Sequence, residues 1–182
     1  RSPGVTAVIL AAGASSRMGA DVPKQFLEVG GRSLLDRAIH AFSGLVDEII
    51  VTVPEGLAEV IGVADPVTLV TGGQTRTESV RRALAKVSFD RVLVHDAARP
   101  FVTSAVIDEI VASLDDYDCA YPVMPVVNSL VVDKRGELVK SPKRAKFREV
   151  QTPQGFRTET LETAIDAAHE PLAAHHLAHH QP

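Results

Sequence analysis

The feature that most constrains the fold is an apolar run at residues 5–10 that stops abruptly at the small residues Ala11, Ala12 and Gly13. A short apolar run bounded by glycine is typical of a strand buried on both faces. The small residues leave backbone amides uncovered, so several N–H groups can converge on one anion. The sequence therefore predicts a buried strand that leads directly into an anion-binding loop.

The predicted loop continues through Ala14 and Ser15, and Arg17 and Lys24 add fixed positive charge. Uncovered amides together with two cations suit a polyphosphate. The loop matches neither the dinucleotide fingerprint G-x-G-x-x-G nor the Walker pattern G-x-x-x-x-G-K-[ST], because Lys24 follows Pro23. On these residues alone, an ordinary surface loop with solvated cations remains an equal alternative.

Apolar runs alternate with amphipathic segments along the rest of the chain. Further strands are expected at residues 46–53, 65–70, 87–94 and 119–127. Helices are expected at residues 34–42, 105–114 and 158–169, with a short helical stretch ending near residue 63. This alternation predicts an α/β fold with a single doubly wound, mostly parallel sheet, in which ligands bind beyond the carboxyl ends of the strands.

Length and charge narrow the classes of protein that fit. The 182 residues suit one domain, and a net charge of −4 excludes a dedicated nucleic-acid or membrane-surface protein, which would need a positive field. Neither a membrane span nor a leader peptide is visible, so a cytoplasmic location is expected. The single cysteine, Cys119, lies in a strand-like run and is expected to be a buried structural thiol.

A second motif occupies residues 71–80. Gly72 and Gly73 would let the backbone approach a flat ligand, and Gln74 follows them directly. The hydroxyl of Ser79, one turn into the next helix, is expected within reach of a base edge. Thr75 and Glu78 also form a capping-box pattern, which explains those two residues structurally but does not explain the double glycine.

The third motif follows the strand expected at residues 87–94. Asp96 would place a carboxylate at the ligand edge of the sheet, where it can hold Mg²⁺ beside the phosphates of a nucleotide. Ala97 and Ala98 keep that edge open. An aspartate after a strand can instead cap the next helix, but Thr103 or Ser104 is the better cap here. His95 is assigned to structure rather than to chemistry.

The alternation of strands and helices stops in the segment 126–150, which is expected to form a protruding β-hairpin. Its strands are expected at residues 129–132 and 137–139, on either side of a turn at 133–136. The segment is locally basic, which suits an anionic substrate or an acidic partner, although solvated charge explains most of its cations. Five histidines near the carboxyl end lack a carboxylate or cysteine partner, so no metal is assigned to them.

Five motifs, taken in order, resemble the 2-C-methyl-D-erythritol 4-phosphate cytidylyltransferase family. The motifs are A-A-G-x-x-x-R-M-G at 11–19, P-K-Q-F-L at 23–27, G-G-x-x-R-x-x-S-V at 72–80, V-H-D-A-A-R-P-F at 94–101 and Q-T-P-Q-G-F at 151–156. The first motif occurs in many nucleotidyltransferases, whereas the ordered set is specific.

The resemblance implies a homodimer with interlocking arms that transfers CMP from CTP to a polyol phosphate and requires Mg²⁺. Arg17 and Lys24 would be catalytic and would grip the α-phosphate, and Asp96 would bind the metal. The nucleotide would contact Ala11, Ala12, Gly13, Ala14, Ser15, Gly73, Gln74, Ser79, Asp96 and Ala97. The polyol phosphate would contact Arg99 and Thr152, with Ser129 and Arg144 contributed by the partner's arm.

This chain departs from the family pattern in the arm. The family usually has Asp-Thr-hydrophobic-Lys where this chain has Asn128-Ser129-Leu130-Val131, so one acidic and one basic residue are replaced. A ribitol-5-phosphate cytidylyltransferase is therefore the alternative enzyme. A degenerate protein that binds CTP without turnover is the alternative from another class, and the His-rich segment before residue 182 suggests that a C-terminal part of the domain is missing.

Overall fold

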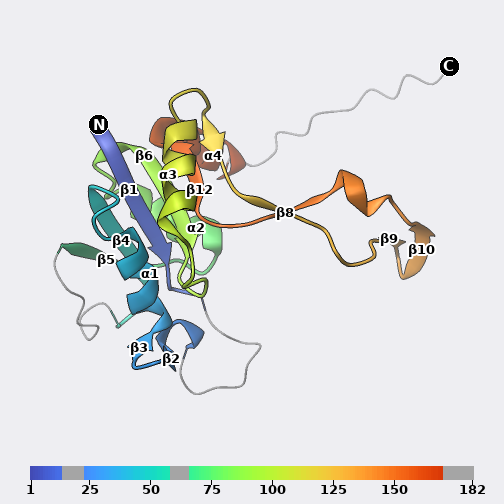
Figure 1. Cartoon of the computed structure of the whole chain (residues 1–182), viewed down its shortest axis with the longest axis horizontal. Helices are drawn as coiled ribbons and strands as arrows, with labels where there is room; N and C mark the ends of the chain where they lie inside the picture. The colour runs from blue at the N-terminus through green and yellow to red at the C-terminus, as the bar shows by residue number, and fades with distance from the viewer. Residues whose placement is uncertain (14–22, 58–65, 170–182) are drawn as a thin grey trace.

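The computed structural model describes residues 1–13, 23–57 and 66–169, and its main body is a twisted sheet covered by helices (Figure 1). Ala14, Ser15, Arg17, the short helical stretch expected to end near residue 63, and the clustered histidines beyond residue 169 lie outside the described residues. No helix within the described ranges combines the length and the apolar character needed to cross a membrane.

The central sheet, as far as the chain is described, has six strands in the order β5-β4-β1-β6-β12-β7. Strands β5, β4, β1 and β6 are parallel, and β12 runs antiparallel to both β6 and β7. The bounds of these strands are β1 Ser2–Leu10, β4 Glu48–Val53, β5 Val67–Thr71, β6 Phe89–Asp96, β7 Cys119–Ala120 and β12 Gln154–Arg157. The expectation of a single, mostly parallel α/β sheet is confirmed.

Among the residues that the structure describes, four α-helices cover the sheet, two on each face. Residues of β1 alternate between the two cores: Ala7 and Ile9 pack with α1 and α3, whereas Val8 packs with α2 and α4. This alternation is what a parallel strand covered on both faces requires. The helices are α1 Leu34–Phe42, α2 Arg76–Leu84, α3 Ser104–Ser113 and α4 Thr158–His169.

The helix starts follow the capping residues expected from the sequence. Ser33 caps α1 in a complete capping box with Asp36. Thr75 caps α2, and its hydroxyl accepts a hydrogen bond from the backbone of Glu78. Thr103 occupies the N-cap of α3 without a side-chain hydrogen bond. The caps expected at Thr75 and Thr103 are therefore at the helix starts that the structure shows, and Ser33 follows the same pattern.

Between residue 23 and α1 the chain forms a short 3₁₀ helix and a small antiparallel ribbon. The 3₁₀ helix η1, Lys24–Phe26, precedes a two-stranded ribbon of β2, Glu28–Val29, and β3, Arg32–Ser33. Gly30 and Gly31 join these strands with φ of +59° and +72°, a left-handed conformation that favours glycine. These two glycines therefore form the turn of the ribbon.

The prediction of one continuous strand at residues 119–127 is wrong, because the structure has two short strands there. Only β7, Cys119–Ala120, joins the central sheet, and the chain then leaves it to form β8, Val123–Pro125. Pro122 and Pro125 cannot donate ladder hydrogen bonds, which explains why the run cannot continue as one sheet strand. Because β7 is an edge strand, Cys119 is exposed rather than the buried thiol expected.

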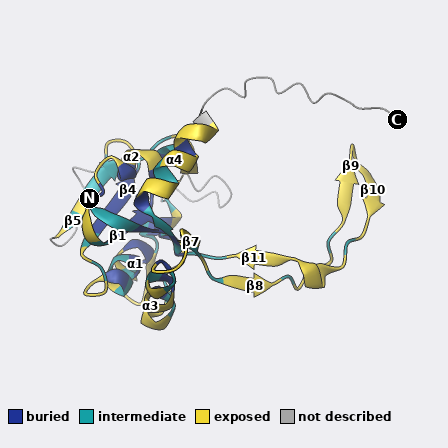
Figure 2. Cartoon of the chain, turned by 90° about the horizontal axis from the view of Figure 1, so that it is seen from above, coloured by how far each residue is buried: buried dark blue, intermediate teal, exposed yellow. Residues whose placement is uncertain are grey.

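The arm comprises residues 123–150 and extends away from the body (Figure 2). Strand β8 pairs with β11, Arg148–Val150, along its stem, and β9, Val132–Lys134, pairs with β10, Glu137–Lys140, near its tip; η2, Arg144–Lys146, lies between. The hairpin is confirmed, but its first strand starts later than expected and also ends later, because the turn is tighter. Arg135 and Gly136 both have positive φ, which permits a two-residue connection.

Candidate functional site

A cavity of about 600 Å³ opens at the carboxyl ends of the parallel strands. The pairing register brings these ends together, because Leu10 lies opposite both Thr52 of β4 and Asp96 of β6. The residues that line the cavity come from these strand ends, from η1 and from the start of α2: Leu10, Ala11, Ala12, Gly13, Lys24, Gln25, Thr52, Gly73, Gln74, Thr75, Arg76, Ser79, Asp96 and Ala98. The structure thus gathers three motifs that are distant in sequence around one hollow.

The start of the anion-binding loop is held from both sides. The backbone N–H of Ala11 donates to the carbonyl of Thr52 at 2.8 Å, which continues the sheet pairing by one residue. The buried amide of Gln25 donates to the carbonyl oxygens of Ala11 and Gly13. Gln25 therefore ties the loop to η1, the segment that carries Lys24 into the cavity lining.

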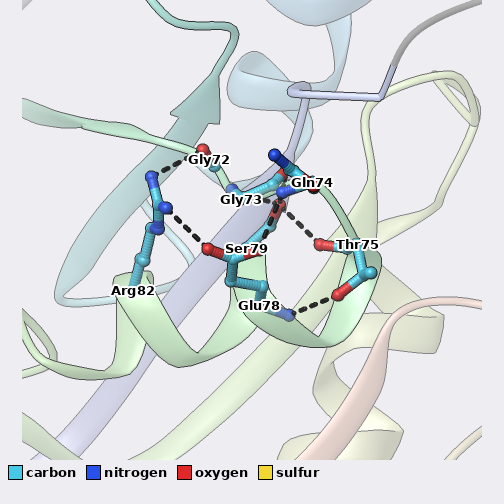
Figure 3. A network of polar contacts seen from close by, with 7 residues as sticks. All are labelled: Gly72, Gly73, Gln74, Thr75, Glu78, Ser79 and Arg82. Atoms are coloured by element: carbon cyan, nitrogen blue, oxygen red, sulfur yellow. Dashed lines mark hydrogen bonds and ion pairs between the residues drawn. The ribbon is translucent and has the colours of Figure 1, made fainter.

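The double-glycine turn is a closed polar network (Figure 3). The backbone N–H of Gly73 donates to Ser79 Oγ at 3.0 Å, and that hydroxyl donates to the carbonyl of Thr75 at 3.0 Å. The N–H of Gln74 donates to Glu78 Oε2 at 2.9 Å. The Ser79 hydroxyl predicted to reach a base edge is therefore also the anchor of the turn.

Arg82 completes this network from the next turn of α2. Its guanidinium donates to the carbonyl of Gly72 at 2.9 Å and to Glu78 Oε1 at 2.6 Å (Figure 3). The N–H of Gln74 and, after it, the guanidinium of Arg82 hold the pKa of Glu78 below its usual range. Glu78 bonds to Gln74 rather than to the N-cap residue, so the expected capping box is only half formed.

Packing within the protein explains the two glycines. A Cβ on Gly72 would lie 2.1 Å from Ala12 Cβ, and a Cβ on Gly73 would lie 2.3 Å from Glu78 Cγ. Both distances are far below van der Waals contact. The structure therefore adds a reason that the sequence interpretation lacked: the glycines let the turn pack closely on the anion-binding loop and on α2.

Asp96 ends β6 at the edge of the cavity. Its carboxylate lies 3.5 Å from Arg76 Nη2 and 3.6 Å from Arg99 Nε. The side chain is 34% exposed, so its oxygens are accessible to a cation that arrives with a nucleotide. No group of three or more His, Cys, Asp or Glu side chains with metal-binding geometry occurs in residues 1–13, 23–57 and 66–169. A single accessible carboxylate such as that of Asp96 can supply one ligand to a divalent cation like Mg²⁺.

The residues expected to hold the polyol phosphate fall into two groups. Arg99 and Thr152 lie beside Asp96: Arg99 forms the ion pair described above, and Thr152 Oγ1 accepts a hydrogen bond from the N–H of Asp96 at 3.4 Å. Ser129 and Arg144 lie on the arm, where the guanidinium of Arg144 donates to the carbonyl of Val127. The structure brings the first pair to the site and leaves the second pair on the protruding segment.

Several lining residues were missed by sequence reasoning or assigned to a neighbour. Ala97 is fully buried and its N–H donates to the carbonyl of Leu10, so Ala98 faces the cavity instead. Gln25 and Arg76 could have been identified from the sequence as lining residues, because both belong to the motifs already quoted. No sequence pattern pointed to Thr52. It lines the cavity, and its buried Oγ1 has no hydrogen-bond partner within the described residues.

Comparison with known proteins gives one consistent result. The family model of 2-C-methyl-D-erythritol 4-phosphate cytidylyltransferase matches residues 5–176. The enzyme of that name from Rhodococcus jostii is 42% identical over 171 residues, which are 90% of this chain and 76% of the relative. The one from Deinococcus radiodurans is 43% identical over 163 residues, 88% of this chain and 68% of the relative.

Solved structures agree with the sequence relatives. The crystal structure of 2-C-methyl-D-erythritol 4-phosphate cytidylyltransferase from Thermus thermophilus superimposes with a TM-score of 0.74 at 36% identity, and the match covers 90% of this chain and 75% of that chain. The fold, the ordered motifs and the sequence relatives lead to one assignment. The chain belongs to the 2-C-methyl-D-erythritol 4-phosphate cytidylyltransferase family.

Proposed function

We propose that this chain transfers CMP from CTP to 2-C-methyl-D-erythritol 4-phosphate and releases pyrophosphate, as a step in isoprenoid precursor synthesis. The observation that carries the proposal is the cavity at the carboxyl ends of β1, β4 and β6, which Lys24 and Asp96 both line. A cation and a carboxylate around one hollow suit a triphosphate and its metal ion. The cytoplasmic location expected from the sequence stays a prediction.

The chemistry needs no covalent intermediate with the protein. A phosphate oxygen of the polyol phosphate attacks the α-phosphorus of CTP as the bond to pyrophosphate breaks on the opposite side. Lys24 stabilises the charge that builds on the α-phosphate oxygens, together with Arg17, which lies outside the described residues. The remaining task of the site is to hold the two phosphates in line.

A bound Mg²⁺ would neutralise phosphate charge and orient the leaving pyrophosphate. Asp96 would hold it, since this carboxylate lies at the cavity edge and is only partly engaged by two exposed arginines. Arg76 and Arg99, which flank this carboxylate, would contact phosphate oxygens of the bound substrates. The ion pairs around Asp96 therefore also keep both arginines beside the metal site.

The double-glycine turn would read the base. Gly73, Gln74 and Ser79 line the cavity together with Ala12, and the network of Figure 3 fixes the turn against α2. A rigid turn can reject a ligand whose donors and acceptors do not match its own. This arrangement supports the roles expected for these residues in binding cytosine.

A second copy of the chain would complete the polyol phosphate site. Ser129 and Arg144 lie on the arm, which extends away from the body of its own chain (Figure 2). Nine exposed large apolar side chains lie on the arm: Val123, Met124, Val127, Val131, Val132, Leu138, Val139, Phe147 and Val150. Exposed apolar surface on this scale marks an interface, which supports a homodimer through the arm.

Pyrophosphate release tests the activity directly. With CTP and Mg²⁺, 2-C-methyl-D-erythritol 4-phosphate should give faster release than ribitol 5-phosphate. The altered arm at Asn128 and Val131 makes ribitol 5-phosphate the necessary competitor, and a faster rate with it would replace the proposed substrate. CTP binding by calorimetry without any pyrophosphate release would instead indicate a binding protein without turnover.

Sedimentation equilibrium tests the dimer. The chain should sediment as a dimer at micromolar concentration, and Val127→Asp with Leu138→Asp should make it monomeric because both side chains are 72% exposed on the arm. Val29→Asp is the matched control, since Val29 is an exposed valine on β2 of the body. A wild-type monomer, or a dimer that survives the arm substitutions, would contradict the proposal.

A further inference from the structure

One buried imidazole connects three residues of the site. His95 is the penultimate residue of β6 and is fully buried, with its ring 5.1 Å from the ring of Phe42. Its Nε2 lies 2.9 Å from the carbonyl oxygen of Arg99. Because a carbonyl only accepts hydrogen bonds, Nε2 carries the proton.

The second ring nitrogen must then be an acceptor. Nδ1 lies 3.0 Å from Thr152 Oγ1, so the Thr152 hydroxyl donates to it. The same oxygen accepts from the backbone N–H of Asp96 at 3.4 Å. The bonds therefore run in one direction, from Asp96 through Thr152 and His95 to Arg99.

Burial of the ring supports this arrangement. The ring is fully buried and packs on Phe42, an environment that favours the uncharged imidazole, in which one nitrogen donates and the other accepts. Phe42 restrains the ring from the side of α1.

We propose that His95 is a positioning residue that sets the relative placement of Asp96, Arg99 and Thr152. The inference rests on the proposed function, because it assigns these three residues to the metal and the polyol phosphate. Asp96 and Arg99 belong to the end of β6 and the loop after it, whereas Thr152 precedes β12. The buried imidazole joins these two segments, together with the bond from Asp96 N–H to Thr152 and the bond from Arg99 to Gln151. A fixed hydrogen-bonded link of this kind keeps Thr152 at a constant distance from Asp96 and Arg99.

The direction of the bonds has a chemical consequence. The hydroxyl proton of Thr152 is directed at His95, so a ligand that reaches Thr152 meets an oxygen that accepts a hydrogen bond. A hydroxyl group of the substrate satisfies this oxygen, whereas an unprotonated phosphate oxygen does not. His95 thereby orients Thr152 towards the polyol part of the substrate.

Two substitutions of His95 separate the two bonds. The amide of His95→Asn reaches the Nδ1 position and keeps the contact with Thr152, whereas the amide of His95→Gln reaches the Nε2 position and keeps the contact with Arg99. Each should raise the KM for the polyol phosphate by about three- to tenfold, the equivalent of one hydrogen bond. The KM for CTP should stay within about twofold of the wild-type value, a split that general destabilisation would not produce.

A double-mutant cycle identifies the bond to Thr152. Thr152→Val removes the contact with the substrate in both backgrounds but removes a bond to His95 only in His95→Asn, so its effect should be larger in His95→Asn than in His95→Gln. Ile165→Val, a buried change in α4 within the core on the other face of the sheet from Phe42, is the control for stability and should leave both KM values unchanged. Equal and additive effects in both backgrounds would overturn the proposal.

Nitrogen-15 NMR of the imidazole decides the bonding independently of turnover. The spectrum should show a protonated Nε2 and an unprotonated Nδ1, and Thr152→Val should shift the Nδ1 resonance whereas Thr152→Ser should not. A proton on Nδ1, or equal spectra for the two Thr152 variants, would overturn the inference even if the His95 variants do not fold. If the wild-type chain released no pyrophosphate, the proposed function would fail while this measurement would still decide the bonding.

Discussion

Arg76 Nη2 lies 3.5 Å from Asp96 Oδ1, which joins the start of α2 to the end of β6 across the edge of the cavity. The two side chains are 50% and 34% exposed, so this ion pair contributes only about 0–1 kcal/mol to stability. Arg76 also donates to the side chain of Gln154 on β12. The pair is therefore weak, and the carboxylate stays accessible to a cation, as the proposed metal site requires.

Asp96→Asn should raise the Mg²⁺ concentration needed for half-maximal activity by about tenfold or more, because the amide lacks the charge that binds the metal. Activity measured against Mg²⁺ at saturating CTP checks this result. Asp108→Asn, an exposed aspartate on α3, should leave the Mg²⁺ dependence unchanged. An unaltered dependence for Asp96→Asn would remove Asp96 from the metal site.

Lys24→Ala should lower kcat by about two to three orders of magnitude, the effect of losing one preorganised charge-stabilising group. The sequence predicts a similar loss for Arg17→Ala. Pyrophosphate release under saturating substrates measures both rates. Lys86→Ala, an exposed lysine just after α2, is the charge-matched control and should keep the wild-type rate; near-normal rates in the two test variants would refute the assignment.

Gly72→Ala should lower the free energy of unfolding by about 1–3 kcal/mol, because the new methyl group would overlap Ala12. Gly13→Ala is the matched comparison: its Cβ would meet no atom of the described residues within 4 Å, so its stability should be close to that of the wild type. Urea unfolding of both variants provides the measurement. Equal stabilities would show that the close packing of the turn on the loop is not required.

Glu162→Gln should destabilise the fold slightly at neutral pH, by about 0.2–1 kcal/mol, because the Arg1 guanidinium bonds both carboxylate oxygens of Glu162. The hydrogen bond from Arg1 holds the pKa of Glu162 below its usual range. A lowered carboxyl pKa gives stability that is complete above the unfolded-state pKa and is lost as the pH falls through the folded-state pKa. Urea unfolding should therefore show a difference between variant and wild type at pH 7 that disappears in acid; a difference independent of pH would contradict this linkage.

Local sequence patterns were sufficient where the deciding interactions are themselves local. The buried strand, the loop after it and the carboxylate at the end of β6 follow from apolar runs bounded by small or charged residues. The caps at Ser33 and Thr75 follow from side chains that bond three residues ahead. The edge of the sheet that carries the site could also be predicted, because parallel strands bring their carboxyl ends together.

Local patterns failed where the environment of a residue depends on its neighbours in the sheet. Cys119 sits in an apolar run that predicts burial, but the run leaves the sheet after two residues and its edge strand exposes the thiol. The arm turn at Arg135 was expected to be longer, because no pattern signals positive φ at an arginine. Pairing partners and backbone angles of this kind are set by the assembled chain.

The sequence by itself determined the α/β class, the buried first strand, the carboxylate at the sheet edge and, through ordered motifs, the family. Only the tertiary structure decided which polar groups meet: Ser79 with Gly73, Gln25 with Ala11, and His95 with Thr152, 57 positions away. The physical reason is that a hydrogen bond depends on distance and direction in space. Sequence patterns carry that information only within a few residues, and the parallel sheet supplies the rest by bringing distant segments together.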